Sequence, residues 1–95
     1  MSPERRIMQT LVNHYVETRA WVPAEVVARR AGIDEAPTST VLNLAARGSG
    51  ARRLVSVRRH DTGTYYAPSR ALLVNMLRQS IQAWTVSDAE AAPRN

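Results

Sequence analysis

A cluster of arginines between residues 47 and 70 is the part of this sequence best equipped for chemistry. The chain of 95 residues has 13 basic and 8 acidic side chains, a net charge of +5, and every basic residue is an arginine. Six arginines and a single carboxylate, Asp61, lie in this stretch, so the rest of the chain balances to zero. A GC-rich genome encodes arginine in place of lysine at any surface, but the clustering indicates a surface that binds a polyanion.

The segment from Pro37 to Arg47 has the pattern of a helix with one apolar and one polar face. At 100° per residue, Val41, Leu42 and Ala45 share one side. The opposite side holds the candidates for contact with DNA bases, which are Ser39, Thr40, Asn43 and Arg47. An asparagine can pair with N6 and N7 of adenine, an arginine can pair with O6 and N7 of guanine, and short hydroxyl side chains let the backbone approach. The alternative is an ordinary solvated helix face.

A second group of side chains is suited to the DNA backbone. The candidates are Arg52, Arg53, Arg58, Arg59, His60 and Thr62. The first two follow a glycine-rich loop at residues 48–50, and the others lie on or beside a predicted turn, where side chains reach phosphate or a narrow minor groove. His60 would add positive charge below about pH 6.5. The alternative is a surface that only keeps the chain in solution.

The sequence offers no catalytic, metal-binding or membrane motif. It has no cysteine, and His14 and His60 are too far apart for a metal-ligand spacing. The longest uninterrupted apolar run, residues 71–74, is far shorter than the roughly 20 residues that span a bilayer. We therefore expect a cytoplasmic, DNA-associated protein that is not an enzyme and has no cofactor, metal or small-molecule ligand.

Periodicity and turn residues predict an α+β fold that is mainly α. Helices are expected over residues 3–19, 23–31, 37–47 and 70–84, a short extended segment at 20–22, and a hairpin of strands 54–59 and 64–67. Ser2 is placed as an N-cap of the first helix and Gly32 as a left-handed C-cap of the second. Residues 1–84 form one predicted domain, and the tail 85–95 has no periodicity and is expected to be disordered.

This order of elements resembles a winged helix-turn-helix domain. Residues 28–33, Ala-Arg-Arg-Ala-Gly-Ile, are similar to the end of the first helix and the turn of that motif. Residues 44–48, Leu-Ala-Ala-Arg-Gly, resemble the end of a recognition helix. The resemblance implies a three-helix core, a two-stranded wing and a C-terminal helix, with the third helix in the major groove and the wing on the backbone or minor groove.

The final predicted helix is more apolar than one side of a small domain requires. Its apolar positions cover about 200° of the helical wheel. The candidates for a dimer interface on it are Leu73, Leu77, Ile81 and Trp84. A symmetric dimer would place two recognition helices about 34 Å apart, one turn of DNA. The alternative is that this face is buried within one monomer.

These observations predict a small, sequence-specific regulator that binds double-stranded DNA as a homodimer. Occupancy of a palindromic site makes repression the simplest mode of action. One alternative is a segregation protein of a plasmid or phage that binds arrays of repeated sites. The other is a winged-helix module whose arginines bind an acidic protein.

Overall fold

The computed structural model describes residues 2–79 of the chain. The elements in order are α1 (Pro3–Thr18), α2 (Ala24–Ala31), α3 (Glu35–Ala45), a 3₁₀ turn (Gly50–Arg52), β1 (Val55–His60) and β2 (Gly63–Pro68). A further helix begins at residue 70 and runs to the last described residue, 79. The expected α+β fold that is mainly helical is confirmed. The expected end of the last helix and the tail 85–95 lie outside the described residues.

Helix α1 begins as its sequence predicts. The Ser2 hydroxyl accepts a hydrogen bond from the Arg5 backbone N–H at 3.2 Å, and Pro3 occupies the first helical position, where no intrahelical acceptor is lost. Ile7 and Leu11 are fully buried one turn apart. The apolar stripe lets α2 and α3 both pack against α1, and these two helices also pack against each other.

Helix α2 ends in the predicted glycine cap, and α3 begins earlier than predicted. Gly32 has φ of 70°, and the N–H groups of Gly32 and Ile33 both donate to the Ala28 carbonyl. The prediction that α3 starts at Pro37 is wrong by two residues, because α3 begins at Glu35. The first N–H groups of any helix have no intrahelical acceptor, so a proline is tolerated at the third position as well as at the first.

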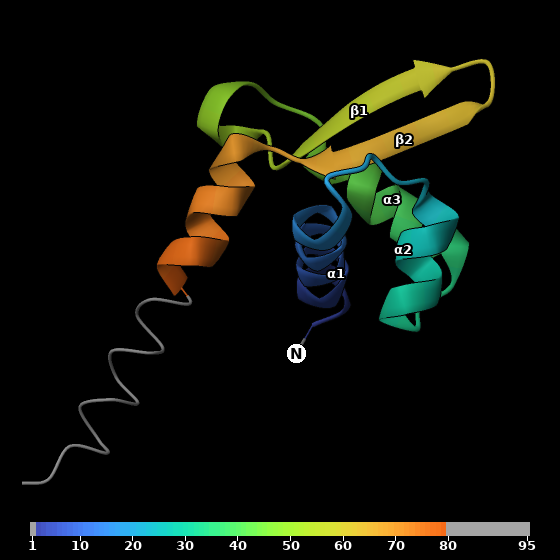
Figure 1. Ribbon diagram of the computed structural model, residues 1–95, viewed down its shortest axis with the longest axis horizontal. Coiled ribbons are helices and arrows are strands. Elements are labelled where there is room, and N and C mark those ends of the chain that lie inside the picture. Colours follow the sequence, from blue (N-terminus) through green and yellow to red (C-terminus); the bar gives the residue numbers. More distant parts are fainter. Residues whose placement is uncertain (1, 80–95) are drawn as a thin grey trace, which may run out of the picture.

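The two strands form an antiparallel hairpin that is joined to the helices by one β-bridge. His60 pairs with Gly63 across a two-residue turn, and Val55 pairs with Pro68 at the other end. Tyr66 exchanges two backbone hydrogen bonds with Val22, of 2.8 and 2.9 Å, so the expected strand at 20–22 is a single bridge. The hairpin therefore lies across the ends of the helices rather than apart from them (Figure 1).

The core lies where the helices meet the base of the hairpin. The α-helices and both strands contribute its most buried side chains, and the 3₁₀ turn contributes none. These side chains are Ile7, Leu11, Val27, Leu42, Val55, Tyr66 and Leu72. Thr38 is also fully buried, and its hydroxyl donates to the Asp34 carbonyl at 2.9 Å. That hydrogen bond removes the cost of burying the hydroxyl group.

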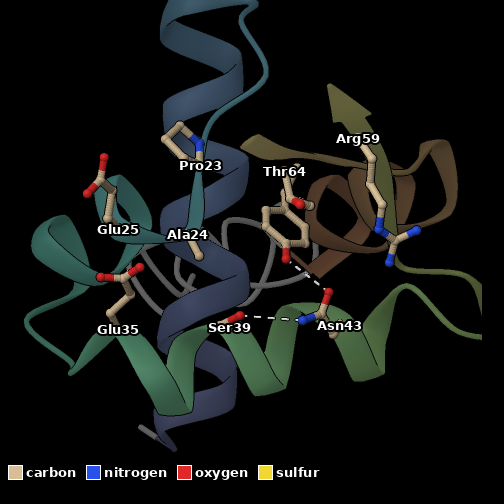
Figure 2. Close-up of a pocket in the computed structure, with 9 residues that line it drawn as sticks. Pro23, Ala24, Glu25, Glu35, Ser39, Asn43, Arg59 and Thr64 are labelled. Carbon is tan, nitrogen blue, oxygen red and sulfur yellow. Dashed lines mark hydrogen bonds between the residues drawn. The ribbon is translucent and has the colours of Figure 1, made fainter. Parts of the chain in front are cut away.

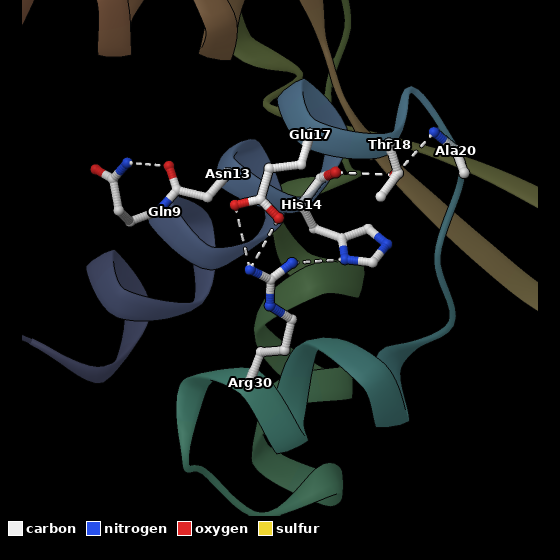
Figure 3. Close-up of polar contacts among 7 residues, drawn as sticks. All are labelled: Gln9, Asn13, His14, Glu17, Thr18, Ala20 and Arg30. Atoms are coloured by element: carbon white, nitrogen blue, oxygen red, sulfur yellow. Dashed lines mark hydrogen bonds and ion pairs between the residues drawn. The ribbon is translucent and has the colours of Figure 1, made fainter.

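A polar contact joins α1 to α2 on the surface (Figure 3). The Arg30 guanidinium donates to Nδ1 of His14 at 2.8 Å and forms an ion pair with Glu17 at 3.2 Å. The Arg30 and Glu17 side chains are 39% and 58% exposed. Exposed pairs of this kind stabilise proteins by about 0–1 kcal/mol, so apolar burial rather than this contact holds the helices together.

Two leucines on α3 provide a direct test of this packing. Leu42 is fully buried and Leu44 is 53% exposed. Leu42→Ala should lower the free energy of unfolding by about 2–5 kcal/mol because it leaves a cavity in the core. Leu44→Ala should change it by no more than about 0.5 kcal/mol. Urea unfolding followed by circular dichroism measures both, and equal losses would contradict the described orientation of α3.

Candidate nucleic-acid interface

Helix α3 presents an exposed face that continues into the residues just after it. Thr40, Asn43, Leu44 and Arg47 are all exposed and recur at the spacing of one helix face. Arg47 lies beyond the last helical residue, and its backbone N–H donates to the Leu44 carbonyl at 3.2 Å. Ser39 is half-buried. Leu44 was not among the residues predicted for this polar side, so its exposure there was missed.

The two neighbouring arginines of β1 lie on opposite faces of the hairpin. Arg59 lines two surface pockets against α3, one of them shared with Val55 and Val57. Arg58 lies on the other face, with its guanidinium carbon 4.3 Å from the centre of the Trp21 ring. This is the geometry of a cation–π contact. The sequence analysis treated the two arginines as equivalent, but the structure brings only Arg59 to α3.

Three arginines from separate segments line one surface pocket of about 380 Å³ beside Asn43. Arg47 comes from the end of α3, Arg53 from the loop before β1, and Arg59 from the hairpin. The Arg53 Nε donates to the Gly48 carbonyl at 3.2 Å, which ties that side chain to the loop. Because all three guanidinium groups carry positive charge, this pocket would attract an anion such as phosphate.

The neighbouring pocket, toward the N-terminus of α3, has a different charge (Figure 2). Its volume is about 330 Å³, and Glu25 and Glu35 line it together with Ser39, Asn43 and Arg59. Two carboxylates at this end repel a polyanion, whereas the arginine pocket attracts one. On this side of the protein, positive charge therefore gathers just after α3 and on the hairpin, where Arg47, Arg53 and Arg59 lie.

Asn43, which lies between the two pockets, is held by two hydrogen bonds within the protein (Figure 2). Its Oδ1 accepts from the Tyr66 hydroxyl at 2.9 Å, and its Nδ2 donates to the Ser39 hydroxyl at 3.4 Å. Both polar atoms of the carboxamide are thus engaged. Sequence reasoning proposed these atoms for pairing with adenine, and it missed Tyr66 as the partner of Oδ1.

The two contacts leave part of the hydrogen-bonding capacity of Asn43 free. A carboxamide oxygen has two lone pairs and its nitrogen carries two hydrogens, so one acceptor site and one donor site remain beside Tyr66 and Ser39. The contact of Asn43 with adenine stays a prediction, and the bonds to Tyr66 and Ser39 restrain the orientation of the carboxamide that would make it.

The remaining backbone candidates lie apart from the arginine pocket. Arg52 is exposed in the 3₁₀ turn and lines neither of the two pockets beside α3. His60 and Thr62 are exposed at the turn of the hairpin. The Thr62 hydroxyl lies 2.9 Å from the Tyr65 hydroxyl, and the His60 ring centre lies 5.8 Å from that of Tyr65. His60 and Thr62 therefore belong to the tip of the hairpin, where both contact Tyr65.

The last helix and α1 form an apolar groove on the side of the helices. Leu73 is half-buried and Leu77 is 62% exposed, and both line this groove of about 320 Å³. Val16 of α1 is 55% exposed in the same groove, a contribution that the sequence analysis did not anticipate. The other two interface candidates, Ile81 and Trp84, lie outside the described residues.

Residues 2–79 hold no group of three or more histidine, aspartate and glutamate side chains that could bind a metal ion. In the same part of the chain, no helix combines the length and the apolar character that crossing a membrane requires.

The chain matches no protein-family model, no curated protein and no solved structure. No relative lends it a function, so the residues of the site carry the proposal that follows.

A double-mutant cycle tests the bond between Tyr66 and Asn43. The cycle formed by Tyr66→Phe, Asn43→Ala and the double variant should give a coupling energy of about 1 kcal/mol. Each single variant already breaks the hydrogen bond, so the double variant does not lose it a second time. Urea unfolding gives the four free energies, and the cycle cancels the higher helix propensity of alanine. The matched cycle with Tyr65→Phe, whose hydroxyl contacts Thr62, should give no coupling. Zero coupling between Tyr66 and Asn43 would contradict the described contact.

Proposed function

We propose that this protein is a sequence-specific regulator that binds double-stranded DNA through a winged helix-turn-helix domain. In this proposal α2 and α3 form the helix-turn-helix, and β1 and β2 form the wing. It binds a palindromic site as a homodimer and acts by occupying that site, most simply as a repressor.

The observation that carries the proposal is the pocket lined by Arg47, Arg53 and Arg59 beside the exposed face of α3. Three positive charges from three segments converge where a recognition helix and a wing would hold a DNA backbone between them. A surface that only maintains solubility needs charged side chains, but those side chains need not meet at one pocket. The carboxylates Glu25 and Glu35 lie at the opposite end of α3, which supports DNA binding at the end where the arginines lie.

The exposed face of α3 supports contact with base edges in the major groove. Arg47 can donate to O6 and N7 of guanine. Thr40 and Leu44 are exposed on the same side and can contact the methyl group of thymine. Arg53 and Arg59 bind phosphates beside α3. These contacts fix the register of α3 on the duplex and do not themselves read the base sequence.

The apolar groove between α1 and the last helix supports the homodimer. Leu77 and Val16 expose 62% and 55% of their surface at its rim. Burying such side chains against a symmetric copy removes apolar area from water, at about 25 cal/mol per Å². The two-fold axis of the dimer then matches that of a palindromic site.

Selection of bound sequences from a random duplex pool tests the proposed function against its alternatives. A regulator of this kind should enrich a palindrome. A direct-repeat array would instead indicate a segregation protein, and no enrichment would indicate a module that binds an acidic protein partner. Either of the last two results would contradict the proposal.

The salt dependence of duplex binding tests the role of the arginine pocket. If each protomer contacts about five phosphates, log K should fall with log salt with a slope of about −9 for a dimer and about −4.5 for a monomer. Arg59→Ala should reduce this slope by about 0.9 per protomer. Arg58→Ala removes the same charge from the preceding residue. It should change the slope less, because the Arg58 side chain lies over Trp21.

Fluorescence anisotropy with a labelled duplex measures these slopes. A wild-type slope shallower than about −3 would contradict the phosphate contacts. Equal effects of Arg58→Ala and Arg59→Ala would show that net charge, not the pocket, drives binding.

A further inference from the structure

Leu44 is an exposed apolar residue on the polar face of α3. It is 53% exposed, whereas Leu42, on the core side of the same helix, is fully buried. The other large apolar residues that are exposed in the described part of the chain lie elsewhere. Val16 and Leu77 line the groove between α1 and the last helix, and Val74 lies on the last helix beside the 3₁₀ turn. Neither the core nor that groove accounts for a leucine at position 44.

Leu44 lies one helical turn before Arg47, the residue proposed to bind guanine. The Arg47 N–H donates to the Leu44 carbonyl at 3.2 Å, so the turn continues past the last residue of α3. Side chains three residues apart on a helix are about 5–6 Å apart, and successive bases of a DNA strand rise by about 3.4 Å. When Arg47 donates to a guanine, Leu44 therefore reaches the edge of a neighbouring base pair.

We infer that Leu44 is a specificity-determining residue that recognises the C5-methyl group of a pyrimidine beside that guanine. The inference rests on the proposed binding of duplex DNA through α3. Thymine alone of the four bases presents a methyl group in the major groove. The leucine side chain has no hydrogen-bonding atom, so it favours this methyl group over the amino and carbonyl groups of the other bases. 5-Methylcytosine has the same methyl group on the same ring carbon, so the contact also favours methylated cytosine over cytosine.

Thr40 is the other exposed residue on this face that has a methyl group. It lies one turn closer to Glu35, which lines the pocket with two carboxylates. Leu44 lies closer to Arg47 and the arginine pocket, at the end of α3 that attracts the DNA backbone. The leucine is therefore the better placed of the two to meet a base edge.

Four duplexes that differ at a single pyrimidine test this contact. Selection from a random duplex pool first identifies the thymine whose preference is lost in Leu44→Ala. That position in one half-site then carries thymine, uracil, 5-methylcytosine or cytosine, each with its Watson–Crick partner, in otherwise identical duplexes. Burial of one methyl group changes Kd by about fourfold, so thymine should bind about four times more tightly than uracil. 5-Methylcytosine should exceed cytosine by the same factor, and fluorescence anisotropy measures both ratios.

Leu44→Ala should bring both ratios close to one, because it removes the apolar surface that contacts the methyl group. The substitution should leave the fold intact because the residue is exposed, and circular dichroism checks this. Val74→Ala is the matched control. It shortens another exposed apolar side chain, on the last helix, and should leave both ratios at about four.

The outcomes distinguish this inference from the proposed function. Equal binding of the thymine and uracil duplexes by the wild type, or no thymine that depends on Leu44, would overturn the role of Leu44 while leaving duplex binding intact. Loss of the ratios in Thr40→Ser but not in Leu44→Ala would also overturn it. A preference for thymine over uracil without one for 5-methylcytosine over cytosine would overturn the extension to methylated DNA. Failure of the wild type to enrich any duplex would overturn the proposed function, and this inference with it.

Discussion

The pairing of Val22 with Tyr66 is the constraint on which the rest of the structure depends. This single bridge, with backbone bonds of 2.8 and 2.9 Å, joins the segment between α1 and α2 to the hairpin. A two-stranded hairpin alone is marginally stable in water, so its position relative to the helices has to come from such contacts. The bridge and the buried Tyr66 ring hold β1 beside α3, which brings Arg59 next to Arg47 and Arg53.

Much of the fold could be predicted because its signals are local in the sequence. The serine cap before α1, the glycine cap after α2 and the turn between the strands each depend on a few adjacent residues, and the structure has all three. The start of α3 was misplaced because a proline fits several positions of a first helical turn. The 3₁₀ turn at Gly50–Arg52 was also missed, because a glycine-rich loop gives no periodic signal.

The candidate site could be predicted only in part, because its decisive contacts join distant segments. The exposed side of α3 followed from the helical period, and Arg47 and Asn43 are exposed as expected. The bond from Tyr66 to Asn43 spans 23 residues, and the stacking of Arg58 on Trp21 depends on where the loop before α2 crosses the hairpin. No local pattern reveals such partners. Alternation along β1 puts Arg59 on the same side as Val55 and Val57, so the apolar pattern indicates that Arg59, and not Arg58, lies on the side of the core and α3.

The opposite orientations of Arg58 and Arg59 make the electrostatics of this protein sensitive to strand register. A slip of one residue in β1 would exchange the two side chains between faces, as it does for any strand. Such a slip leaves composition and net charge unchanged, yet it would put His60 or Arg58 where Arg59 now faces α3. It would also move Val55 and Val57 out of the core, so apolar burial protects the charge pattern. An insertion in the Asp61–Thr62 turn would therefore be tolerated only if it left the pairing of Val57 with Tyr66 intact.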